Sequence, residues 1–349
     1  MHNTQGQSPR SPPLNRISST LPRRLFVILL LSLGVYVLLP RLVGVPGTLS
    51  AIRQARILPL LAAASCQVAS CLSLAYAVHG MLLGLGPGVG FVNVLQVTLA
   101  SGFASMFLPS LGLSGMAVRA RYWREHGYAV ETTFLVGTLE TLGQGAAHTI
   151  LLALALLRQQ LAGQTAPWRL LPMLLSVILL GSAALALVLS SPRSWRDILL
   201  RPLNYLRKHW GRAPTSALAL EQRLSNLRRA LVALPRPAKV SLLLGSLLRN
   251  VANALCLHWT LLAYGQRVPL QQSFISWTVS DFLGALSTLP GGLLVTDTSL
   301  SALLAGVGVT LSTAVTVTLT FRLIALWLPR AIGIVAWYIL QRRSPEPLW

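Results

Sequence analysis

Residues 289–297 read Leu-Pro-Gly-Gly-Leu-Leu-Val-Thr-Asp and separate two apolar stretches, each of which is suited to a lipid bilayer. Proline removes a backbone hydrogen-bond donor and glycine loosens the chain, so a helix is expected to break at Pro290, Gly291 and Gly292. At membrane depth such a break is tolerated only where it is buried in protein or lines a cavity. The stretch therefore predicts a re-entrant pair, in which one helix enters the bilayer, turns at the break and returns.

The same pattern occurs 181 residues earlier in the chain. LPSLGLSGMAVRARYWREHG, which begins at Leu108, aligns without a gap with LPGGLLVTDTSLSALLAGVG, which begins at Leu289. The alignment places a second helix break at Pro109, and each segment follows one apolar span and precedes another. Paired interrupted segments in the two halves of a membrane protein point to a transport site. Two unrelated proline-kinked helices are the alternative.

Composition places the whole chain in a membrane. Of its 349 residues 53% are hydrophobic and 11% are charged, whereas a soluble domain carries about a quarter of charged residues. We expect an all-α, polytopic transmembrane helix bundle in which two re-entrant, proline-broken helix pairs form an inverted repeat. Spans of about 20 apolar residues are long enough to cross the bilayer. The candidates are 25–39, 57–79, 91–108, 131–157, 169–190, 239–264, 272–289 and 309–340, the last interrupted at Pro329-Arg330.

The net charge of +21 suits either nucleic acid or an anionic membrane surface. The basic residues lie between and beside the apolar runs, as the positive-inside rule requires, so we expect no nucleic-acid partner. The longest polar stretch, 191–238, is placed in the cytoplasm by its arginines. Five leucines at helical spacing within it predict an amphipathic helix, lying on the anionic leaflet or packed on the underside of the protein: Leu220, Leu224, Leu227, Leu231 and Leu234.

Counting crossings from this segment places both termini in the cytoplasm and the two broken pairs on opposite sides of the membrane. The same count puts Arg119, Arg121 and Arg124 at the cytoplasmic surface. The expected organisation is a disordered cytoplasmic tail at 1–24, a transmembrane domain at 25–340 and a cytoplasmic tail at 341–349. Within that domain repeat one covers about 91–157 and repeat two about 272–340.

Five ionisable residues lie inside apolar segments: Glu140, Asp281, Asp297, Arg249 and Arg322. Each costs about 2.5–3.5 kcal/mol at a helix centre on insertion scales, so such residues normally face the bundle interior and pair with one another. Glu140, Gln144 and His148 follow at intervals of four and form one polar stripe. We expect Arg322 and Arg249 to neutralise some of the three carboxylates around a central cavity. These seven residues would form a path for a charged headgroup; ion pairs that only fix packing are the alternative.

Motifs of ordinary enzymes are absent from the sequence. It has no Gly-x-Ser-x-Gly elbow, no Walker loop and no His-Glu-x-x-His motif. Cys66, Cys71 and Cys256 have neither disulfide-framework nor zinc-site spacing. We therefore expect no catalytic residue, no cofactor and no metal.

Three strings in the C-terminal half resemble the lysylphosphatidylglycerol synthase transmembrane-region family, also called flippase-like. They are Leu-Pro-Gly-Gly-Leu-Leu-Val-Thr-Asp at 289–297, Gly-Val-Gly at 306–308 and Phe-Arg-Leu-Ile-Ala-Leu-Trp-Leu-Pro at 321–329. The first half is similar at Phe107-Leu-Pro109, Gly115-Met-Ala-Val-Arg119 and Gly127. Three positions depart from the family pattern. Asp297 replaces a usual Glu, Met116 stands where Asp is common, and Thr141 follows Glu140 where Arg is common.

The resemblance implies a membrane module that moves a lipid or lipid-linked precursor between the leaflets of a bacterial inner (plasma) membrane. In the family's multidomain members a separate soluble domain makes the lipid, and 191–238 is the only sizeable polar segment here, so the translocase module alone is expected. Membrane lipids would be the partners. A non-transporting scaffold or accessory subunit, docked to an envelope-lipid enzyme through 191–238, is the alternative. An intramembrane transferase ranks last, because no donor-site signature is visible.

Overall fold

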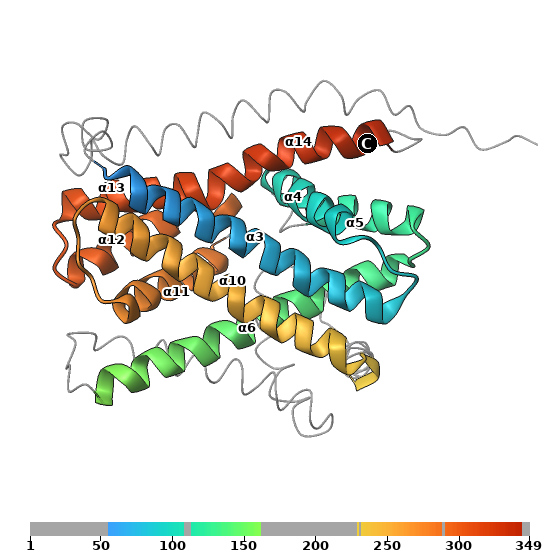
Figure 1. The fold of residues 1–349 in the computed structure, drawn as a ribbon, viewed down its shortest axis with the longest axis horizontal. Helices are drawn as coiled ribbons and strands as arrows, with labels where there is room; N and C mark the ends of the chain where they lie inside the picture. The colour runs from blue at the N-terminus through green and yellow to red at the C-terminus, as the bar shows by residue number, and fades with distance from the viewer. Residues whose placement is uncertain (1–54, 108–112, 162–228, 230–231, 288–289, 344–349) are drawn as a thin grey trace, which may run out of the picture.

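The computed structural model describes residues 55–107, 113–161, 229, 232–287 and 290–343, and every regular element in this part of the chain is helical (Figure 1). The expected all-helical class is confirmed for these residues. The predicted spans 25–39 and 169–190, both tails, Pro109 and nearly all of 191–238 lie outside them. The elements are α3 (Ile57–Leu85), α4 (Phe91–Phe107), α5 (Leu113–Glu125), α6 (Val130–Leu161), α10 (Arg236–Ala263), α11 (Leu270–Leu286), η2 (Pro290–Gly292), α12 (Val295–Gly306), α13 (Leu311–Arg322), η3 (Leu323–Trp327) and α14 (Leu328–Arg343).

Length and surface composition identify a membrane protein. Among the described residues α3, α10 and the continuous stretch Leu311–Arg343 are long and apolar enough to span a bilayer. Large apolar side chains such as Ile57, Leu61, Leu83, Val335 and Tyr338 are exposed on the outside of the bundle. Water would penalise such a surface, whereas lipid tails accept it.

Helix bounds recur at the spacing of the sequence repeat. Moving α3, α4, α5 and α6 forward by 181 residues brings their ends within three residues of those of α10, α11, α12 and the α13–α14 stretch. The neighbours recur as well: α4 packs on α14 and α5, and α11 packs on α6 and α12. The correspondence thus begins one helix earlier than the predicted repeats, because it includes α3 and α10.

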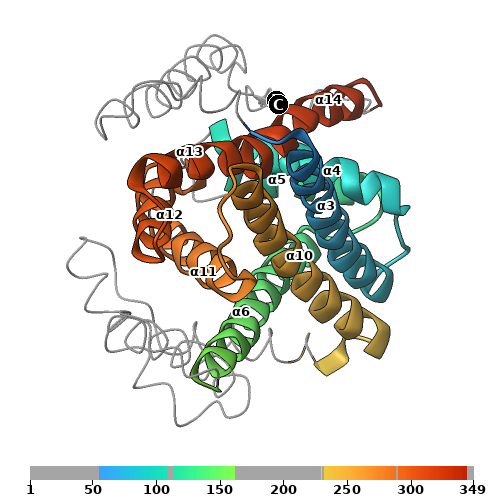
Figure 2. The same cartoon turned by 60° about the vertical axis from the view of Figure 1, so that its left-hand side comes forward.

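The two long helices α3 and α10 lie side by side and run in opposite directions (Figures 1 and 2). The first amide before α3, Arg56 N–H, donates to Ala263 O at the end of α10 at 2.9 Å, and Ser70 near the middle bonds Asn253 at 3.0 Å. Their axes approach closely at glycines. A Cβ on Gly245 would lie 2.6 Å from a carbonyl oxygen of α3, and one on Gly80 would lie 1.8 Å from a side-chain oxygen of α10. Small residues at such contacts are how membrane helices come together.

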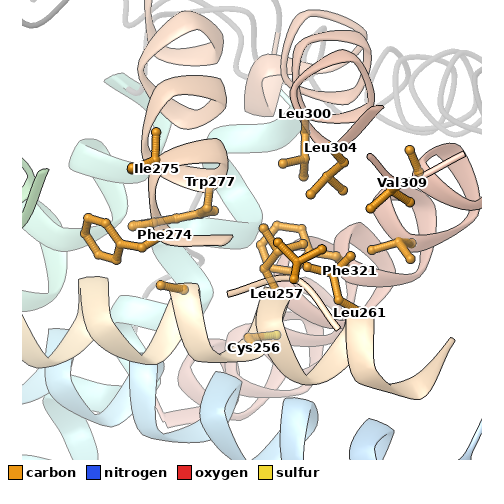
Figure 3. Close-up of a cluster of buried hydrophobic side chains, with 14 of the residues drawn as sticks. Cys256, Leu257, Leu261, Phe274, Ile275, Trp277, Leu300, Leu304, Val309 and Phe321 are labelled. Carbon is orange, nitrogen blue, oxygen red and sulfur yellow. The ribbon is translucent and has the colours of Figure 1, made fainter. Parts of the chain in front are cut away.

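Two hydrophobic cores occupy opposite ends of this central pair. The first joins the C-terminal half of α10 to α11, α12 and α13, with Trp277, Leu300, Leu304 and Phe321 turned toward one another (Figure 3). The second joins the C-terminal half of α3 to α4, α5, α6 and α14 around the fully buried Trp123. Figure 2 separates α11–α13 on one side of α10 from α3–α5 on the other. The middle of the bundle, between the two cores, remains for polar side chains.

The last span stays helical through the predicted interruption at Pro329. Its i→i−4 pattern widens to a π-turn at Leu323–Trp327 and then resumes as α14. Proline has no amide hydrogen, and its ring collides with the carbonyl four residues earlier, so a locally wider turn accommodates it. Arg322 immediately precedes the π-turn and Arg330 follows it.

Candidate functional site

The break between α11 and α12 has a strained backbone held by one carboxylate. Gly291 and Gly292 have φ of 63° and 64°, and Leu294, with its larger side chain, has φ of 69°. A non-glycine residue in this region costs on the order of 1–3 kcal/mol and persists only where its surroundings enforce it. The Asp297 carboxylate supplies that restraint, because its Oδ2 accepts the Leu294 N–H at 2.9 Å.

Asp297 also forms the most buried ion pair among the described residues. Its Oδ1 lies 2.8 Å from Arg322 Nε, and the two side chains are 3% and 9% exposed. Arg322 Nη2 donates in addition to Gly291 O at 2.8 Å. The guanidinium therefore binds both the strained turn and the acid that restrains it, joining α13 to the break. Arg322 has as its partner one of the three carboxylates that the sequence offered it.

A cavity of about 650 Å³ opens beside this break, between the two cores. Gly291, Gly292 and Thr296 line one wall, and Gly102 and Ser105 of α4 line another. Six of the seven residues predicted for the polar path line it as well: Glu140, Gln144, His148, Arg249, Asp281 and Arg322. Asp297 does not; it lies behind Arg322. The cavity has the size of a small-ligand site.

The cavity lies at the depth of the bilayer centre. Its α3 lining includes Ser70 and Cys71, and its α10 lining includes Arg249 and Asn250, which are the central residues of these 29- and 28-residue helices. At 1.5 Å per residue, each end of either helix is then about 20 Å away along the axis.

Glu140 pairs with a different arginine from those expected. Its Oε2 lies 2.5 Å from Arg119 Nη1, and the side chains are 11% and 14% exposed. Arg119 Nε also donates to Ser101 on α4 at 3.0 Å. The assignment of Arg119 to the cytoplasmic surface is therefore wrong, because the turn of α5 directs it into the cavity. Arg121, two residues later, pairs instead with Glu125 along the helix.

The rest of the stripe on α6 links this helix to α10 and α11. Gln144 accepts from Asn250 at 3.2 Å and donates to Ser246 at 3.3 Å. His148 faces Asp281, with Nε2 and Oδ2 separated by 3.5 Å. Asp281 is also within electrostatic reach of Arg249 and Arg322. Its side chain is 52% exposed although it lines the cavity, so the carboxylate is accessible there.

Cationic charge exceeds anionic charge around the cavity. Four arginines line it, whereas Glu140, Asp281 and the adjoining Asp297 are the carboxylates of the described residues near them. Arg249 and Arg330 form no ion pair with any described residue; Arg330 only donates to Leu326 O at 3.4 Å. Sequence reasoning missed Arg330 as a lining residue, although an arginine within an apolar span was itself a signal. Within the described chain no three His, Cys, Asp or Glu side chains gather as a metal site would require.

The fold and the site define an α-helical membrane protein with a charged cavity at mid-depth, beside a broken helix. A family model, that of the lysylphosphatidylglycerol synthase TM region, matches residues 25–333, and the chain belongs to this family. A curated relative, "UPF0104 membrane protein PH1989" of Pyrococcus horikoshii, is 34% identical over 82 residues, which are 24% of either chain. The match thus spans about a quarter of the length of that relative.

Proposed function

We propose that this protein moves the polar headgroup of a lipid or lipid-linked precursor between the leaflets of a bacterial inner membrane. The observation that carries the proposal is the cavity, which brings ionisable groups from α5, α6, α10, α11, α13 and α14 together at mid-depth. Ionisable groups there are costly unless they serve a pathway or pair completely. Here the pairing is incomplete, because Arg249 and Arg330 lack carboxylate partners within the described chain.

The volume favours a headgroup, with the acyl chains remaining in lipid. About 650 Å³ is enough for a phosphate and a few attached polar atoms, and falls far short of a whole diacyl lipid. The charge favours an anion. Guanidinium groups bind phosphate oxygens through charge-assisted, often bidentate hydrogen bonds, and Arg249 and Arg330 are the groups available for this role.

We further propose that the two helical units form an inverted repeat whose alternation exposes the cavity to either side. Support comes from the helix bounds that recur at 181 residues and from the antiparallel packing of α3 against α10. In transporters built in this way, substrate sites lie near the midplane at discontinuous helices, and one repeat rocks against the other. Both termini would lie in the cytoplasm, with 191–238 on the anionic leaflet.

Leaflet exchange in reconstituted vesicles tests the proposal. The purified protein is placed in liposomes with acyl-labelled fluorescent phosphatidylglycerol, and the inner-leaflet fraction is followed by quenching from outside. We expect exchange above that of protein-free vesicles. The Arg249→Gln/Arg330→Gln variant should exchange roughly a hundredfold more slowly, if each lost charge-assisted contact is worth about 1.5 kcal/mol. Arg267→Gln, which removes an exposed charge, is the matched control.

A labelled lipid with an uncharged sugar headgroup separates anion recognition from general leakage. We expect the double variant to lose the preference for phosphatidylglycerol over this lipid. Exchange equal to that of protein-free vesicles, with both lipids, would refute transport of these headgroups and favour the accessory-subunit alternative. Equal rates for the wild type and the double variant would refute the role of the two arginines.

A further inference from the structure

One contact in the cavity involves a proton whose position is constrained by the hydrogen bonds. The Nδ1 atom of His148 lies 3.0 Å from Gln144 O, one turn earlier on α6. A carbonyl oxygen only accepts, so Nδ1 must carry the hydrogen of this bond. The other ring nitrogen, Nε2, then presents a lone pair when the imidazole is neutral and an N–H when it is charged.

The surroundings of Nε2 make the neutral form unfavourable while Asp281 is ionised. Nε2 is buried and has no hydrogen-bond partner among the described residues, and Oδ2 of Asp281 is 3.5 Å away. A lone pair directed at a carboxylate is repulsive, whereas a proton between the two atoms turns the contact into an ion pair or a neutral hydrogen bond. His148 and Asp281 thus share one place for one proton.

We propose that His148 and Asp281 form a proton-binding site that couples headgroup movement to proton movement. This inference rests on the proposed translocase function and adds its coupling ion. The pair joins α6 to α11, which carry the second and the first core respectively. A proton bound there holds the two units together at the cavity, and its loss leaves a repulsive contact between them.

The charges around the pair set the sign of the coupling. Arg249 on α10 and Arg322 on α13 face Asp281, Arg119 on α5 and Arg330 on α14 line the same cavity, and Glu140 lies two turns before His148. A phosphate bound by the unpaired arginines offsets their positive charge and so favours the added proton. By reciprocity the bound proton favours the anion. Proton and anionic headgroup therefore bind together and move in the same direction.

The structure contains a reporter for this proton. The His148 ring stacks on the indole of Trp277, with centroids 5.0 Å apart and planes at 24°. An imidazolium quenches a stacked indole more strongly than a neutral imidazole does. The Trp277 signal is the difference between the emission of the wild type and that of Trp277→Phe, recorded for the full chain in lipid nanodiscs from pH 4.5 to 9.

The titration has a defined expected result. We expect a single one-proton transition in the Trp277 signal, with lower emission on the acidic side. It should vanish in His148→Gln and move to lower pH by one unit or more in Asp281→Asn, because the carboxylate that holds the proton is gone. His126→Gln, an exposed histidine stacked on a tyrosine, should leave it unchanged. A transition that survives in His148→Gln, or that Asp281→Asn does not shift, overturns the site.

Vesicles with an imposed pH gradient test the coupling separately. With labelled phosphatidylglycerol, the wild type should accumulate headgroups several-fold in the leaflet on the alkaline side, and His148→Gln should equilibrate them evenly. Equal leaflet populations in the wild type with and without the gradient, at rates above protein-free vesicles, would overturn proton coupling while leaving translocation standing. No exchange by the wild type would overturn the proposed function, and the Trp277 titration would still decide whether the proton site exists.

Discussion

Replacing Asp297 by asparagine should destabilise the protein strongly, because it leaves the Arg322 guanidinium buried without its anion. The carboxylate is 3% exposed and the arginine 9% exposed, so water cannot take over the lost interaction. Removing one partner of a buried pair costs about 3–5 kcal/mol. Asparagine keeps an oxygen for the Leu294 N–H, so Asp297→Asn isolates the charge. Asp297→Ala should cost about 1 kcal/mol more, through that hydrogen bond.

A double variant separates the ion pair from the shape of the site. Asp297→Asn/Arg322→Met removes both charges at similar volume, and such neutral replacements are often no worse than the pair they replace. We expect the double variant to be more stable than Asp297→Asn alone by about 2 kcal/mol or more, which is strong coupling by the standard of double-mutant cycles.

The assay is the free energy of unfolding in a dodecylmaltoside–SDS titration, followed by tryptophan fluorescence. Arg267→Gln serves as control, since an exposed charge without an ion pair should change stability by no more than about 0.5 kcal/mol. If Asp297→Asn stays within 1 kcal/mol of the wild type, or if the double variant costs the sum of the two single changes, the pair does not stabilise the break in the way argued here.

Three further outcomes are expected. Glu140→Gln should lower the free energy of unfolding by about 3 kcal/mol, by leaving Arg119 unpaired, and Arg119→Gln in the same chain should restore most of the loss in the SDS titration. Tyr128→Phe removes a hydroxyl that bonds one carbonyl and one amide at the end of α3; it should cost about 1–2 kcal/mol in the same titration and leave leaflet exchange unchanged. Gly80→Val should reduce the yield of monodisperse protein in size-exclusion chromatography by forcing α3 away from α10, whereas Gly145→Ala, with no atom near its Cβ, should not.

The spans were predictable because the lipid environment demands long apolar runs. The expected 239–264 and 91–108 correspond to α10 and α4 within three residues. The break was predictable for the same reason: in a bilayer the lost backbone hydrogen bonds of Pro290 and the two following glycines cannot be transferred to water. The π-turn was less accessible, since proline signals a disturbance without specifying how the helix absorbs it.

The partner of Glu140 was missed because Arg119 was treated as part of a block of surface arginines. The repeat contained the signal. At an offset of 181, Asp297 corresponds to Met116 and Arg322 to Thr141, so the first unit seems to lack the pair of the second. The structure places an ion pair there nonetheless, between residues 119 and 140, one turn and one residue away, and with acid and base exchanged between the helices. Side-chain reach, which alignment does not record, allows this displacement.

The close contact of α3 with α10 decides which parts of the molecule are free to move. A Cβ is not tolerated at the contact, so these two helices can neither slide nor separate without collision and behave as a fulcrum. Any rocking that opens the cavity has to be carried by the shorter helices at the two ends, α4–α5 and α11–α12. Cross-links between α3 and α10 should accordingly leave the cycle running, and cross-links between α6 and α11 should stop it.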